Sequence, residues 1–220
     1  MVTCEKVPVM PCGFESLQNL EPESICSIHP LVGLAGDLYN KLSEISLLAV
    51  RRMSRHASAR SANIFAAEAA QLEAYLKSWQ APKRGENRRL FNEAVYAAEA
   101  IRWAALIRLY QVVDGSAINP EKRQNAVNRV GYFISQIRPG SSLEAQLLFP
   151  LFMAGLSATR KAELLSIEYR ITVLESTVGT GNITGAHKLL DLFWERSQWG
   201  TGNVDWEFLL QEKHANVVLY

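Results

Sequence analysis

The sequence has few cysteines and no closely spaced pair of them. Only three occur among its 220 residues, Cys4, Cys12 and Cys26, and none forms the C-x-x-C pairing that holds zinc in most structural sites. Their irregular spacing favours solvated thiols over a metal site or a redox switch. An odd number of thiols without a secretory signal pattern indicates a reducing compartment.

The sequence also lacks a charge excess and a long apolar run. Its 23 Lys and Arg residues nearly balance 22 Asp and Glu residues, and a net charge of +1 cannot strongly attract a nucleic acid. The first 28 residues lack a basic segment followed by an apolar run, and no later stretch approaches the roughly 18 apolar residues of a membrane span. We therefore expect no autonomous DNA or RNA binding, no secretion and no membrane insertion.

The residues that are present have the composition of a packed domain, with 48% apolar and 20% charged. Apolar residues recur at three- and four-residue intervals, which predicts helices, and no alternating strand pair is found. These stripes cover residues 34–49, 65–79, 91–109, 127–137, 164–178, 186–193 and 206–210. The pattern predicts an all-α fold, a bundle of stacked antiparallel helical hairpins with about eight helices.

Proline and glycine mark the expected ends of these helices. Breaks are predicted at Pro82 and Gly85, at Asp114-Gly115, before Pro120 and at Pro139-Gly140. The tetrapeptide Gly-Thr-Gly-Asn occurs at 179–182 and again at 200–203, where glycine suits a helix end and asparagine the following N-cap. A phosphate-binding loop is disfavoured there, because neither copy follows a strand or carries a P-loop lysine. Residues 1–28 are interrupted by Pro8, Pro11, Gly13 and Pro22 and are predicted to be a flexible tail, which leaves 29–220 as the domain.

The segment 143–158 differs from the other stripes because it has almost no polar face. It predicts a helix buried on most sides at the centre of the core. Pro150 lies inside this run, where its missing N–H group should kink the helix or begin a new one.

No catalytic or metal-binding constellation is visible, so the sequence nominates no catalytic residue, no metal ligand and no cofactor-binding residue. The four histidines are far apart and lack a partner at a metal-ligand spacing. They are His29, His56, His187 and His214. No serine lies in a G-x-S-x-G elbow.

Two basic clusters are candidates for a nucleic-acid footprint or a nuclear import signal, but a solvated helix end is the favoured interpretation of both. The first cluster is Arg51, Arg52, Arg55 and Arg60, and the second is Lys83, Arg84, Arg88 and Arg89. Large aromatic residues at helical spacing favour core packing over a ligand pocket. These are Trp103, Phe149, Phe152, Phe193 and Trp194.

Several of these segments together resemble the fungal-specific transcription factor domain. The most specific match is 147–156, LLFPLFMAGL, followed by Arg160, Gly181-Asn182, Leu189-Leu190 and Trp194. Softer matches are HPLVGL at 29–34, Asp205-Trp206 and the ending VVLY at 217–220. The resemblance therefore covers about residues 29–220.

The resemblance implies an α-helical regulatory domain that acts in the nucleus to control RNA polymerase II transcription and has no catalytic residue. Relatives normally carry a six-cysteine, two-zinc DNA-binding cluster, which this sequence lacks. Zinc is therefore expected only in that absent cluster, and this chain is expected to bind no cofactor and no DNA directly. Its expected partners are transcription proteins or a small-molecule effector.

Two other hypotheses remain open at the level of sequence. A helical interaction scaffold without a transcriptional role would be favoured by regular repeats of about 34 residues, and none is found. A small-molecule enzyme would need clustered titratable groups in a cleft, and the sequence nominates none.

Overall fold

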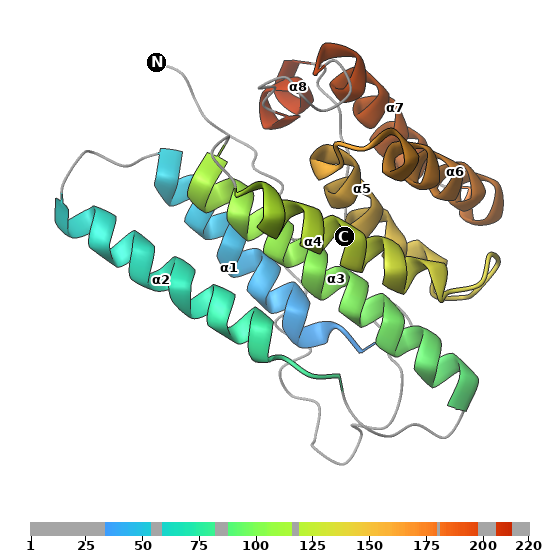
Figure 1. Cartoon of the computed structure of the whole chain (residues 1–220), viewed down its shortest axis with the longest axis horizontal. Coiled ribbons are helices and arrows are strands. Elements are labelled where there is room, and N and C mark those ends of the chain that lie inside the picture. Colours follow the sequence, from blue (N-terminus) through green and yellow to red (C-terminus); the bar gives the residue numbers. More distant parts are fainter. Residues whose placement is uncertain are drawn as a thin grey trace.

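The helices of this protein form two groups that share one short central helix (Figure 1). The structure, a computed structural model, describes residues 34–53, 59–81, 88–115, 119–179, 181–197 and 206–212. Over those ranges it contains eight α-helices, one short 3-10 helix and no strand, which confirms the predicted all-α bundle. The predicted tail at residues 1–28 lies outside the described ranges, and so do Pro82, Gly85 and the second Gly-Thr-Gly-Asn copy.

The first group is built around one long helix. The helices α1 (Gly36–Met53), α2 (Ala59–Ser78) and α4 (Pro120–Ser135) all pack against α3 (Arg88–Asp114), and their axes run side by side in Figure 1. Because α3 has neighbours on several sides, its buried surface is wider than the single predicted stripe. Ala97, Ala100, Ala104 and Leu106 lie outside that stripe and are fully buried.

The second group of helices begins after a short turn at residues 141–143. A 3-10 helix (Glu144–Leu147) leads into α5 (Leu148–Ser157), and α6 (Lys161–Val178) and α7 (Gly181–Arg196) pack against α5. The last described helix, α8 (Trp206–Glu212), packs on α7. Since α5 also contacts α3 and α4, it joins the two groups.

Capping residues explain where several of these helices begin and end. The side chain of Asn119 accepts hydrogen bonds from the backbone of Glu121 and Lys122, and Pro120 occupies the first helical position of α4. Gly115 and Gly179 follow α3 and α6 with φ of 60° and 65°, which is the left-handed conformation that glycine adopts without strain. Asn182 lies inside the first turn of α7, so the N-cap position predicted for it is wrong.

The proline in the buried segment begins a new helix instead of kinking an existing one. Pro150 is the third residue of α5, in the first turn, where a backbone N–H has no partner within the helix. The apolar run is therefore divided between the 3-10 helix and α5. All ten residues of α5 are buried, as the missing polar face predicts.

Gly155 lets α5 and α7 approach closely. A Cβ atom added at Gly155 would lie 3.0 Å from Leu190 Cδ2 and 3.3 Å from Trp194 Cζ2. The indole Nε1 of Trp194 donates a hydrogen bond of 2.9 Å to the Gly155 carbonyl oxygen, which is one of the last carbonyls of α5 and lacks an intrahelical partner. This contact fixes the second group on the central helix.

Candidate functional site

An apolar groove of about 680 Å³ lies between α4 and α6, with α5 beneath it. Leu151 and Ala154 of α5 line its base, Val130 and Ile134 of α4 line one wall, and Ile167 of α6 lines the other. The groove exists because α4 and α6 both pack on α5, which is shorter than either of them. Its volume is in the range of sites that hold small molecules, about 300–1,000 Å³.

Polar bridges join the α4 and α6 segments near both ends of the groove. At one end, the Gln124 side-chain amide donates a hydrogen bond to the Glu163 carboxylate. At the other end, Arg170 Nη2 donates to the backbone oxygen of Ile137, just beyond α4, at 3.1 Å. Glu163 and Arg170 also line the groove, so both bridges lie at its edge.

The charges at the groove are balanced within the protein. Arg170 is 8% exposed, and its Nη2 lies 3.0 Å from the carboxylate of Glu144, which is 1% exposed. That carboxylate also accepts a hydrogen bond of 2.6 Å from the Thr177 hydroxyl. The Nε of Arg170 is buried without a hydrogen-bond acceptor. The basic group is therefore held as part of an ion pair and leaves no net charge for an ionic ligand.

The mouth of the groove is aromatic. Tyr132 on α4 and Tyr169 on α6 line the groove and are 55% and 68% exposed. Leu165, four residues before Tyr169 on the same helix, is 50% exposed and extends the apolar surface beyond the groove. Exposed large apolar residues gathered at one place are typical of interaction sites.

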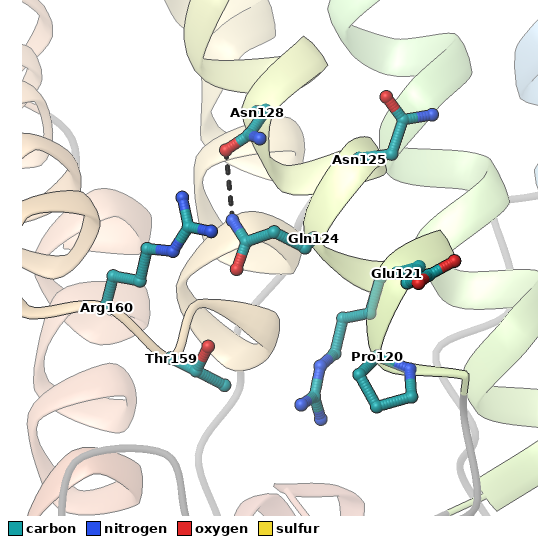
Figure 2. A pocket seen from close by; sticks show the side chains of 8 residues that line it. Pro120, Glu121, Gln124, Asn125, Asn128, Thr159 and Arg160 are labelled. Atoms are coloured by element: carbon teal, nitrogen blue, oxygen red, sulfur yellow. Dashed lines mark hydrogen bonds between the residues drawn. The ribbon is translucent and has the colours of Figure 1, made fainter.

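A second hollow, of about 560 Å³, lies at the amino-terminal end of α4 and is polar (Figure 2). Figure 2 shows the Gln124 amide bonded to Asn128, with Thr159 and Arg160 facing them from the α5–α6 connection. Arg160 and Glu163 form an ion pair at 3.8 Å and a capping box at the start of α6. Arg160 and Glu163 serve helix capping, and the lining of the hollow carries both signs of charge, so the hollow has the character of a solvated junction.

The aromatic residues singled out from the sequence are core residues. Phe149, Phe152, Phe193 and Trp194 are buried, and the Phe152 ring meets the Trp206 ring edge-on at 5.5 Å. Trp103 is partly buried, and the guanidinium groups of two arginines lie near its ring.

Two arginines of the first basic cluster are engaged by other groups of the protein. Arg51 pairs with Glu68 at 2.8 Å, and Arg52 donates to the backbone oxygen of Gln111 at the end of α3 at 3.1 Å. Arg60 is exposed. Arg55, Lys83 and Arg84 and the side chains of Arg88 and Arg89 lie outside the described residues.

Only one of the four histidines, His187 on α7, belongs to a described segment. Its Nδ1 lies 3.1 Å from the Glu175 carboxylate of α6, so it serves as a link between those helices. Within the described residues no group of three or more His, Cys, Asp or Glu side chains is placed to hold a metal ion. The three cysteines and the other histidines lie outside those residues.

Comparison with protein families identifies the chain. The model of the fungal-specific transcription factor domain matches residues 11–220. The chain belongs to this family. Searches of curated proteins and of solved structures return no significant match.

Membership of the fungal-specific transcription factor domain family gives the chain a regulatory role in fungal transcription factors, and the family is one of transcription regulators, not of enzymes. The family match begins 18 residues before the predicted domain boundary at residue 29, and that boundary stays a prediction. None of the described helices is both long and apolar enough to cross a membrane.

The most specific family motif coincides with the centre of this fold. Residues 147–156 form the end of the 3-10 helix and most of α5, and Gly155 and Trp194 supply the α5–α7 contact. The groove, by contrast, was not predicted from the sequence. The available signal was the position of Tyr132 and Tyr169 on the otherwise polar faces of their helices.

Proposed function

We propose that this chain is the regulatory domain of a fungal RNA polymerase II transcription factor, that it acts in the nucleus, and that it responds to partner proteins or to an effector instead of reading DNA itself. The observation that carries the proposal is the family match over residues 11–220. The proposal requires no metal or organic cofactor bound to this chain.

The electrostatics of the chain support the part of the proposal that concerns DNA. The net charge is +1, and Arg51 and Arg52 already contact a carboxylate and backbone oxygens of the protein. A DNA-binding surface needs lysine and arginine side chains free to neutralise phosphates. Binding to a mixed-sequence DNA duplex can be measured by fluorescence anisotropy near physiological salt. The dissociation constant should not fall below the ordinary non-specific range of about 10⁻⁴ to 10⁻⁶ M.

A reporter experiment tests the regulatory role. The whole chain is fused to an unrelated DNA-binding domain, and reporter transcription is compared with that given by the DNA-binding domain alone. A matched pair of variants controls for folding: Phe152→Asp places a charge in the core and should abolish the effect, whereas Phe208→Asp changes a side chain that is 62% exposed and should leave it intact.

Activation or repression by the wild type and by Phe208→Asp, lost in Phe152→Asp, is the expected result. An unchanged reporter, together with no binding to any nuclear protein, would overturn the proposal. That outcome would favour a helical interaction scaffold with no transcriptional role.

A further inference from the structure

We propose that the groove between α4 and α6 is the effector site of this domain and that its ligand is a small, uncharged and predominantly apolar molecule. The assignment of an effector rests on the proposed function, whereas binding itself is a property of the groove. Three observations carry the inference: the bridged ends, the balanced charges, and a wall residue that leaves open space.

The bridges near both ends favour a small molecule over a protein helix. Glu163 and Arg170, which bridge to α4 at either end, are seven residues apart on α6, or about 10 Å along its axis. An α-helix with its side chains is about 10–12 Å across and several turns long. A docked helix would therefore have to break one or both bridges, while a compact molecule fits between them.

The balanced charges favour an uncharged ligand. Burying an ion without a partner is costly, and the charge of Arg170 is already matched by Glu144. An anionic ligand would have to displace that carboxylate. What the groove offers is the apolar base on Leu151 and Ala154, with the exposed side chains of Tyr132 and Tyr169, which can form hydrogen bonds, along its lining.

A ligand bound in this groove would affect the stability of the rest of the domain. A ligand that contacts both walls would add attraction between α4 and α6, which are otherwise held together mainly through α5. Because α5 also packs on α3 and α7, occupancy would stabilise the arrangement of the two helix groups. The bound and free domains would then differ in stability, and that difference can be measured.

Gly131 provides a way to fill the groove without disturbing the fold. It lies in α4 on the groove wall, and a Cβ atom added there meets no atom within 4 Å. The variant Gly131→Phe places a ring in the open space. Gly131→Ala is its matched control, since it also removes the glycine from the helix and leaves the groove nearly as large.

The experiment uses Nile red, a neutral apolar dye whose fluorescence rises in an apolar environment, with the whole chain. We expect wild type and Gly131→Ala to bind the dye saturably at one site, with dissociation constants within about twofold of each other, and we expect the dye to raise the melting temperature of both proteins. In Gly131→Phe, binding should weaken by about tenfold or more, while the protein melts no lower than the wild type. If that variant does not fold, Ala162→Trp blocks the groove from the exposed face of α6.

Two outcomes would overturn the proposal: no saturable binding to the wild type, or binding to folded Gly131→Phe equal to that of the wild type. If Leu165→Ser abolishes the binding that Gly131→Phe leaves intact, the dye lies on the exposed surface beyond the groove, which would indicate a protein-docking face. An active reporter without dye binding refutes only the groove proposal, and dye binding with a silent reporter refutes only the transcriptional role.

Discussion

Two glycines of this protein offer the same substitution in opposite surroundings. At Gly155 an added Cβ atom lies 3.0 Å from Leu190 Cδ2, closer than ordinary contact, whereas at Gly131 it meets nothing within 4 Å. Both glycines lie within helices, where alanine is favoured over glycine by about 0.8–1.0 kcal/mol. The two alanine variants therefore share the same gain in helix propensity and differ in how the added methyl group packs against its neighbours.

The expected difference follows from how firmly the neighbours of Gly155 are held. Leu190 is fully buried, and Trp194 is fixed by its hydrogen bond to the Gly155 carbonyl oxygen, so neither side chain can move away easily. Overpacking a core by one group costs about 1–3 kcal/mol. Gly131→Ala should thus stabilise the protein by about 1 kcal/mol. Gly155→Ala should be less stable than Gly131→Ala by about 1–3 kcal/mol.

Urea unfolding followed by far-ultraviolet circular dichroism gives both free energies of unfolding by linear extrapolation. A third variant, Leu190→Val in the Gly155→Ala background, removes the crowding methyl groups and should recover part of the loss. Equal stability of the two alanine variants would refute the reasoning, because it would show that the α5–α7 contact yields to an added methyl group without cost.

Three further predictions concern charge in and around the core. Phe152→Asp should unfold the protein, seen as loss of the thermal transition, and Phe208→Asp should melt like the wild type. Glu144→Gln removes one partner of a buried ion pair and should cost about 3–5 kcal/mol in urea unfolding, and a loss below about 1 kcal/mol would contradict that role. The Lys77 ammonium, hydrogen-bonded to Glu73, lowers the pKa of that carboxyl below 4.5, so its stabilisation is present above pH 4.5 and is lost as the pH falls through the lower pKa. The stability difference between wild type and Glu73→Gln should therefore be constant near neutral pH and shrink in acid, and a difference independent of pH would count against it.

Helix positions could be predicted from the sequence because they depend on local patterns. The segment from Pro120 to Pro139-Gly140, with its stripe at 127–137, contains α4, and the all-apolar run at 143–158 contains a helix without a solvent-facing side. Residue spacing gives the face that a helix buries, and breakers give its ends. The exact ends are less well determined, as the position of Asn182 within α7 shows.

The groove could not be predicted, because it depends on how three helices lie relative to one another. Arg170 lies on the buried face of α6, three residues after Ile167, but its spacing does not indicate which group pairs with its charge. Its partner Glu144 is 26 residues earlier, in a 3-10 helix that no periodic pattern indicates. Tyr132 and Tyr169 also look like ordinary surface residues until α4 and α6 are placed on either side of α5.

The complete burial of α5 also limits how the protein can be divided. A ten-residue helix that packs on α3, α4, α6 and α7 belongs to both helix groups, so a fragment ending before it or beginning after it would expose apolar surface to water. The described helices should consequently unfold together in one cooperative transition, with no stable half-folded form. Fragments for interaction mapping should therefore keep α3 to α7 in one piece, because a truncation between them would report the loss of the fold and not the loss of a binding surface.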